Sequence, residues 1–216
     1  MKVIINAIEV RNIMKKIFCI IGQSASGKDS VCRKIFNVEK IDKIGLKQNI
    51  MYTTRPMRSG EVDGVEYHFV DDAYLKKYQD WGRVVECRTY NTVFGEWNYF
   101  TLAESFNLEK NDYLLTNTLE GFKALRNYFG DDVVIPIYIY VSDITRLKRS
   151  LVREENPNCK EICRRFLADE HDFCPEKILA AQIPIENCFE NIDLDITAKE
   201  IRNRILEYQE TFVKRK

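Results

Sequence analysis

The apolar run Ile17–Ile21 ends directly in a glycine-rich stretch, GQSASGKDS, at residues 22–30. The run is typical of a buried parallel strand, and apolar residues recur at helical spacing over Val31–Phe36. A strand, a glycine loop and a helix in this order, with the pattern G-x-x-x-x-G-K-[ST], form a nucleotide phosphate loop. Asp29 stands where a hydroxyl usually meets the metal ion. The stretch therefore predicts a phosphate-loop fold with one departure from the pattern.

The chemistry of such a loop assigns roles to its residues. Terminal glycines let backbone N–H groups close around phosphates, and the lysine reaches the β and γ oxygens. We therefore expect ATP and Mg²⁺ as cofactors and Lys28 as a catalytic residue, with Asp29 or Ser30 as the metal ligand. A glycine-rich turn without a ligand is the alternative. The predicted ATP-binding residues of the loop are Gly22, Ser24, Ala25, Ser26, Gly27, Lys28, Asp29 and Ser30.

Strand and helix patterns alternate beyond the loop. Buried strands are expected near Tyr113–Leu115 and over Ile135–Val141, followed by helices over Leu119–Phe129 and Ile144–Val152. This alternation predicts an α/β fold of three layers, with a parallel sheet between helices.

The end of the chain predicts a long helix. An apolar stripe of Ile201, Ile205, Tyr208 and Phe212 shares one face, which is typical of core packing. Thr197 and Glu200 are spaced as a capping box at the start of this helix.

The remaining segments indicate how the chain is organised. Residues 47–102 are rich in Tyr, Thr, Val and Phe and carry turn signals, which predicts an insert of short antiparallel strands that holds a substrate. Residues 154–160 contain proline and no helical period, as in a mobile loop. The expected segments are an appendage at 1–13, core with the phosphate loop at 14–46, the insert at 47–102, core at 103–153, a helical lid at 154–175, and core with the C-terminal helix at 176–216.

Composition limits the partners that we expect. The 33 basic and 33 acidic residues cancel, so a small anionic ligand fits better than a nucleic acid or a membrane. No apolar run approaches the ~18 residues that cross a bilayer, and the first residues lack the pattern of a secretory signal, so we expect a cytoplasmic protein. The oligomeric state is left open.

The cysteines favour a reduced protein without a metal. They number seven, an odd count, and no C-x-x-C pair occurs, so buried thiols are expected rather than disulfides. Zinc is the less favoured alternative, because the spacing matches no common zinc site and a helix would bury the cysteines. The candidate zinc ligands are Cys159, Cys163, His171 and Cys174.

A second motif, YTTRPMRSGEVDGVEYHFV at residues 52–70, offers groups for a second phosphate. Arg55 and Arg58 can bind a phosphate through bidentate hydrogen bonds, and the hydroxyl of Tyr67 can donate a third. Two solvent-facing arginines on a turn are the alternative. Because a clamp and a phosphate loop in one chain support each other, we predict that the mixed-β insert binds a monophosphate.

This motif resembles the guanylate kinase signature T-T-R-x-x-R-x-G-E-x-x-G-x-x-Y-x-F at every defined position. The resemblance runs from about Lys15 to the C-terminus and implies transfer of the γ-phosphoryl group of ATP to GMP. It places Glu86 where the family reads guanine, whose N1–H and N2–H₂ groups one carboxylate can accept as a pair. It also implies that Tyr90 and Phe94 bind the substrate and that Asn191 lies near the adenine of ATP.

Transfer between two anions requires positive charge over the migrating group and exclusion of water. Arg153 precedes the predicted mobile loop, and Arg164 and Arg165 follow it. The resemblance implies lid arginines at similar positions, so we predict that these residues are catalytic, without choosing between Arg164 and Arg165. A solvated charged helix face is the alternative.

The chain departs from the family pattern at several positions. Met51 replaces a serine that helps to read the base, Phe94 a tyrosine, and Glu96 a serine or threonine, while Thr116 and Thr118 replace two aspartates. Two alternatives follow: a kinase of another monophosphate such as dGMP, or a guanylate-kinase-like binding module without catalysis. The retained lysine and glycines of the phosphate loop favour an enzyme.

Overall fold

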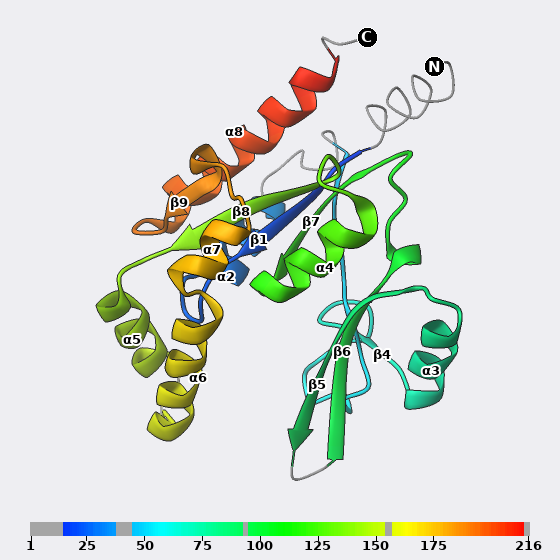
Figure 1. Ribbon diagram of the computed structural model, residues 1–216. Helices are drawn as coiled ribbons and strands as arrows, with labels where there is room; N and C mark the ends of the chain where they lie inside the picture. Colours follow the sequence, from blue (N-terminus) through cyan, green and yellow to red (C-terminus); the bar gives the residue numbers. More distant parts are fainter. Residues whose placement is uncertain (1–14, 38–44, 93–94, 154–156, 214–216) are drawn as a thin grey trace.

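Every side chain of the central strand β1 (Ile17–Ile21) is fully buried. The computed structural model describes residues 15–37, 45–92, 95–153 and 157–213. Within these residues, β1 lies in the middle of a five-stranded parallel sheet of order β2-β7-β1-β8-β9 (Figure 1). The other strands are β2 (Leu46–Gln48), β7 (Asp112–Asn117), β8 (Val134–Tyr140) and β9 (Cys188–Glu190).

Helices cover both faces of this sheet, which is why β1 can be apolar throughout. Phe18 and Ile20 pack in a cluster with α2 (Lys28–Phe36) and α8 (Leu194–Val213). Successive strand side chains point to opposite faces, so the side chains of alternate residues, such as Cys19, pack with α4 (Leu119–Phe129). The expected α/β fold with a parallel core sheet is confirmed.

Three helices follow β8 along the chain. They are α5 (Asp143–Val152), α6 (Cys159–Asp172) and α7 (Pro175–Ala180). In Figure 1, α5 and α6 lie beside each other at the edge of the core. Helix α6 falls within the segment expected to be a lid, and we call it the lid helix.

The insert forms a second, mixed sheet of order β4-β3-β6-β5. Strands β3 and β6 pair antiparallel, as do β5 and β6, but β3 and β4 pair in parallel, which corrects the expectation of antiparallel strands alone. The insert also contains a helix, α3, that was not predicted. Its elements are β3 (Tyr52–Thr53), β4 (His68–Phe69), α3 (Asp72–Asp80), β5 (Val84–Thr92) and β6 (Gly95–Leu102).

The boundary of the insert also differs from the expectation. Strand β2 continues to Gln48 and pairs with β7 in the core sheet, so residues 47 and 48 belong to the core. The insert sheet begins at β3. The expected appendage at residues 1–13 lies outside the described residues, as does Phe94.

The expected capping box of the last helix is wrong, because α8 begins at Leu194 and not after Thr197. The carboxylate of Asp193 caps the helix and accepts from the backbone N–H groups of Asp195 (2.9 Å) and Ile196 (3.0 Å). Thr197 is buried in the first turn and donates to the carbonyl of Glu190 over 3.5 Å. Ile201 and Ile205 are buried, as the apolar stripe predicts.

The expectation of buried cysteines holds for part of the set. Cys19 and Cys32 are buried, and burial raises the pKa of both thiols. Cys87, Cys159 and Cys163 are exposed. The last two lie on the lid helix, which has no buried residue. Among the described residues, no three His, Cys, Asp or Glu side chains gather as a metal site, and no helix has the length and apolarity to cross a membrane.

Asp193→Ala should lower the free energy of unfolding by about 1 kcal/mol, since two N–H groups at the start of α8 lose their acceptor. The urea midpoint should fall with an unchanged slope. Glu200→Ala is the matched control and should change stability by less than about 0.5 kcal/mol. An equal loss in both variants would contradict this assignment of the cap.

Candidate functional site

The phosphate loop leaves the carboxyl end of β1 and enters α2 at Lys28. Gly27 has a φ of 94°, in the left-handed region that favours glycine, and a side chain there would collide with Asn191. A side chain at Gly22 would collide with the carbonyl of Ile139 on β8. Both glycines are therefore required for a loop that packs this tightly. The N-terminus of α2, which follows the loop, is a favourable place for an anion.

Two side chains hold the loop from behind. The Nδ2 of Asn191 donates to the carbonyl oxygen of Ser26 over 2.8 Å, and Nη1 of Arg149 donates to the same oxygen over 3.3 Å. Arg149 also donates to the backbone carbonyl of Asn191 over 2.8 Å. Asn191 is buried, so the structure gives it a supporting contact to the loop, and the adenine contact implied by the resemblance stays a prediction.

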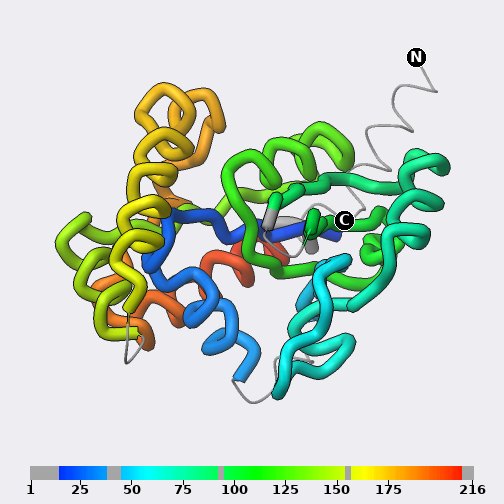
Figure 2. The backbone as a smooth tube through the Cα atoms, turned by 90° about the horizontal axis from the view of Figure 1, so that it is seen from below, coloured from blue at the N-terminus to red at the C-terminus, as the bar shows by residue number. Residues whose placement is uncertain are grey.

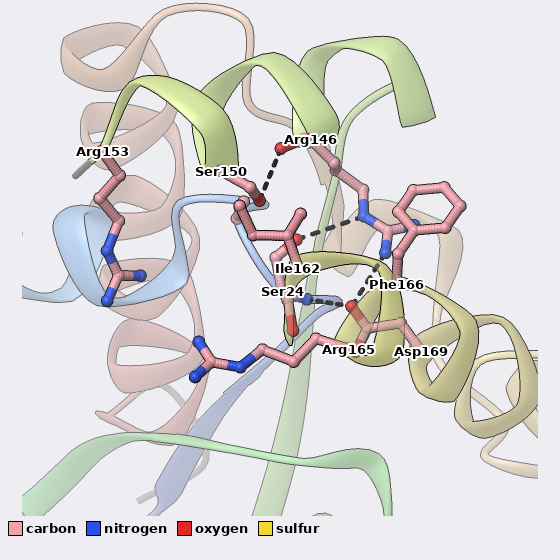
Figure 3. Close-up of a pocket in the computed structure, with 9 residues that line it drawn as sticks. Ser24, Arg146, Ser150, Arg153, Ile162, Arg165, Phe166 and Asp169 are labelled. Atoms are coloured by element: carbon pink, nitrogen blue, oxygen red, sulfur yellow. Dashed lines mark hydrogen bonds and ion pairs between the residues drawn. The ribbon is translucent and has the colours of Figure 1, made fainter. Parts of the chain in front are cut away.

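A buried arginine joins the loop to α5 and to the lid helix. The side chain of Arg146 is 1% exposed. Its Nε donates to the carbonyl of Ser24 over 3.2 Å, and its Nη2 donates to Oδ2 of Asp169 over 2.9 Å (Figure 3). The same Oδ2 accepts from the backbone N–H of Ser24 over 2.8 Å, and the guanidinium lies 4.5 Å from the ring centroid of Phe166. These contacts fix the position of α6 beside the loop.

Sequence reasoning missed Arg146 and Arg149. Both lie on α5 among other charged residues, where a solvated helix face is the ordinary expectation. Apart from Asp143, which pairs with Arg146 from three residues away, their partners lie more than 20 residues along the chain, so local spacing carries little signal for their roles.

The structure separates the three predicted lid arginines. Arg153 and Arg165 line a cavity together with Ser24 and Ala25 of the phosphate loop, and Figure 3 shows both guanidinium groups reaching toward one side of it. Arg164 is not among the lining residues. Its side chain is 64% exposed and pairs with Glu161 over 2.7 Å.

Glu161 sits between two arginines of the lid helix. It accepts from Arg164 and from Nε of Arg165, each over 2.7 Å. These hydrogen bonds, first that of Arg164 and then that of Arg165, lower the pKa of Glu161 to about 2. The carboxylate thus stays charged at neutral pH and orients Arg165.

The first turn of α2 presents side chains without protein partners. In the described part of the chain, Lys28, Asp29 and Ser30 make no side-chain hydrogen bond or ion pair, and Asp29 is exposed. An ammonium, a carboxylate and a hydroxyl at a helix N-terminus suit a phosphate with its metal ion. The residues present therefore fit ATP and Mg²⁺.

The predicted clamp is organised around Glu61. Arg55 is 3% exposed and makes a bidentate contact with Glu61, at 2.7 and 3.0 Å, while its Nε donates to the hydroxyl of Tyr99 over 3.1 Å. The hydrogen bond to Glu61 is the largest cause of a raised Arg55 pKa. Glu61 also accepts from the backbone N–H of Arg58 over 2.7 Å. The exposed side chain of Arg58 makes no hydrogen bond or ion pair among the described residues.

Tyrosines surround this clamp. The ring of Tyr67 lies 5.7 Å from the Arg55 guanidinium and 5.4 Å from the ring of Tyr99. Tyr90, which is 48% exposed, packs edge-on against Tyr99 at 5.5 Å. Burial raises the pKa of Tyr67, and Tyr99 and Asp29 add to the rise.

The backbone seen from below shows how these elements are ordered in space. Figure 2 shows α2 between the helices α5 and α6 on one side and the insert on the other. The helix that follows the phosphate loop thus lies between the lid helix and the insert that carries the predicted clamp.

Glu86 is buried, although carboxylates on strands are mostly exposed. Its Oε1 accepts from Thr101 over 3.0 Å and from Asn117 over 3.5 Å, and its Oε2 accepts from Arg88 over 3.2 Å. Asn117 ends β7, so the carboxylate lies where the insert meets the core sheet.

One of the two residues that replace the family aspartates has a structural role. Thr118 is the N-cap of α4 and accepts from the backbone N–H of Gly121 over 3.1 Å. A capping hydroxyl is engaged by the helix, so Thr118 stabilises α4. Asp29 is an exposed carboxylate directly after Lys28.

Comparison with known proteins gives consistent results. The family model of guanylate kinase matches residues 14–205. The guanylate kinase of Syntrophotalea carbinolica is 32% identical over 70% of this chain and 68% of its own length, and that of Caldanaerobacter subterraneus is 30% identical over 68% of each. The crystal structure of guanylate kinase from Anaplasma phagocytophilum superposes with a TM-score of 0.63 at 18% identity, over 91% of this chain and 87% of that chain.

Arg146→Met should lower the free energy of unfolding by about 3 kcal/mol, because Asp169 and the loop carbonyl lose a buried charged partner. Guanidinium denaturation measures the change. Arg164→Met is the matched control on the lid helix, and loss of its exposed ion pair should cost less than about 0.5 kcal/mol. Equal stability of both variants would show that Arg146 does not hold the lid helix to the loop.

Proposed function

The chain belongs to the guanylate kinase family, and we propose from this membership that it is an ATP-dependent guanylate kinase in the cytoplasm. The reaction is ATP + GMP = ADP + GDP. The observation that carries the proposal is the cavity in which Arg153 and Arg165 meet the phosphate loop. Two guanidinium groups beside a phosphate loop suit the charge that develops on a migrating phosphoryl group.

The donor nucleotide is assigned to the phosphate loop. Its phosphates would bind at the start of α2, where Lys28 has no protein partner in the described residues and the helix dipole favours an anion. The contacts of Arg149 and Asn191 to Ser26 keep the loop in its shape before ATP arrives.

Mg²⁺ is assigned to Asp29 and Ser30. When bound, it neutralises charge on the β and γ oxygens of ATP. An exposed carboxylate directly after Lys28 suits this cation, which is commonly held by one or two carboxylates and by the phosphates themselves.

The acceptor phosphate is assigned to Arg58 and Tyr67, with Arg55 behind them. Glu61 and Tyr99 fix the Arg55 guanidinium, and four of its five N–H donors already have partners. The exposed side chain of Arg58 is free to bind the phosphate through two N–H groups.

Catalysis then rests on position and charge, without a covalent intermediate. The side chains of Lys28, Arg153 and Arg165 stabilise the charge that is spread over the transferring group. The lid helix is held to the phosphate loop through Arg146 and Asp169, and it would exclude water from the transferring group on that side of the loop.

A coupled ADP-release assay with ATP, Mg²⁺ and a panel of nucleoside monophosphates tests the proposal. GMP should support turnover, and dGMP tests the nearest alternative substrate. Binding of GMP without turnover of any acceptor would favour the non-catalytic module and refute the enzyme. A preference for a pyrimidine monophosphate would exclude Glu86 as the guanine reader.

Lys28→Ala should lower kcat at least about 100-fold, because a positive charge on the transferring group is lost. Lys34→Ala is the matched control, since Lys34 lies on the same helix and pairs with Asp195 at the surface. Stopped assays at saturating substrates give kcat for both variants. A near-normal kcat in Lys28→Ala would remove the phosphate loop from the mechanism.

Asp29→Ser restores the usual hydroxyl and removes the carboxylate. We expect the Mg²⁺ concentration for half-maximal activity to rise by about 10-fold, because a carboxylate near the cation is lost. A titration of activity against Mg²⁺ measures the shift. An unchanged rate and an unchanged Mg²⁺ dependence would show that Asp29 has no role at the metal.

A further inference from the structure

The buried carboxylate of Glu86 shares its site with an arginine that sequence reasoning did not single out. Arg88 follows two residues later on β5, so both side chains point to the same face of the sheet. The Nε of Arg88 donates to Oε2 of Glu86 over 3.2 Å, and its Nη2 contacts the sulfur of Met51 at 3.6 Å. The Arg88 side chain is 21% exposed and that of Glu86 is 3% exposed, so the arginine forms the open side of this pair.

Most of the acceptor capacity of Glu86 is already used. A carboxylate offers about four acceptor positions, two on each oxygen. Oε1 is filled by Thr101 and Asn117, whereas among the described residues Oε2 accepts from Arg88 alone. Reading N1–H and the 2-amino group of guanine together requires one N–H on each oxygen. Reading N1–H alone requires only the open position on Oε2, beside Arg88.

Arg88 has donors that its protein partners use weakly. A guanidinium carries five N–H groups, and a thioether sulfur such as that of Met51 is a weak acceptor. A carbonyl oxygen would bind the same N–H more strongly, and O6 of guanine is a common partner of arginine. In a 6-oxopurine, O6 is bonded to the ring atom next to N1, so the O6 acceptor and the N1–H donor lie side by side. The Arg88 donors and Oε2 of Glu86 likewise lie side by side.

We infer that Glu86 and Arg88 act as one unit that reads the N1–H and the O6 of the acceptor base and leaves the 2-amino group unread. The inference rests on the proposed function, because it specifies the acceptor of that same site. The substrate class is then 6-oxopurine nucleoside monophosphates, in which hypoxanthine is accepted beside guanine. Adenine is rejected, because its unprotonated N1 faces a carboxylate and its 6-amino group faces a guanidinium.

The first test compares GMP, IMP and AMP with the full chain. The ADP-release assay gives kcat/KM, and calorimetry without ATP gives Kd for each monophosphate. IMP should match GMP within about 10-fold, and AMP should be at least about 100-fold poorer, since buried polar groups facing the wrong base are left unpaired. A deficit of IMP beyond about 10-fold would show that the site reads the 2-amino group and would overturn the inference.

Arg88→Met keeps the length of the side chain and removes its donors. We expect kcat/KM to fall by about 10- to 100-fold for GMP and IMP alike, mainly through KM, with little change for AMP. Arg88→Lys should recover part of the loss. The matched control is Arg83→Met on the same insert, where the arginine pairs with Glu104 at the surface over 2.7 Å. The ratio of GMP to AMP does not depend on the folded fraction, so an unchanged ratio in Arg88→Met would overturn the inference.

The two proposals fail in different ways. If no monophosphate is turned over, the proposed function is refuted, and calorimetry still tests base reading: similar Kd values for GMP and IMP with weak AMP binding support it. If GMP is turned over and IMP is not, the kinase stands and the inference falls. If GMP, IMP and AMP bind equally, the Glu86–Arg88 pair is closed to the base and the inference falls as well.

Discussion

The position of the lid helix beside the phosphate loop depends on one buried charge. A guanidinium that leaves water must keep its hydrogen-bonding partners, because an uncompensated buried charge costs several kcal/mol. Arg146 pairs with Asp143 on its own helix, and its other partners come from the phosphate loop, through the Ser24 carbonyl, and from the lid helix, through Asp169 and Glu170. The need to satisfy a single side chain therefore fixes where the phosphate loop and the lid helix lie relative to each other.

Local signals in the sequence predicted the core and not the contacts between distant segments. The run Ile17–Ile21 and the helix Leu119–Phe129 have the same bounds in the structure, because apolar periodicity is decided within a few residues. The parallel pairing of β3 with β4 and the supporting roles of Arg146 and Arg149 were not predictable in this way, since each depends on residues far along the chain. The cap of α8 was missed because Asp193 and Thr197 both suit a helix start, and tertiary packing decided between them.

One departure from the family pattern lies beside a buried carboxylate. Met51 and Arg88 lie 37 residues apart and touch, and another nitrogen of the same guanidinium donates to Glu86. A serine replaced by methionine thus changes the surroundings of an arginine that binds the buried carboxylate. At the end of β7, Asn117 donates to Glu86, and Gly121 on α4 leaves room for the Asn117 side chain. The single departure at Met51 is thus connected, through Arg88 and Glu86, to the end of β7.

Glu61 has a further consequence for how a ligand reaches the clamp. By immobilising the Arg55 guanidinium in advance, it removes an ordering cost that binding would otherwise carry. The same ion pair offsets the Arg55 charge, so long-range attraction on this side falls to the exposed Arg58. In the proposed function, capture and retention of the acceptor would thereby be divided between two arginines three residues apart. The association rate should respond to ionic strength through Arg58, while the lifetime of the complex depends on the rigid Arg55 behind it.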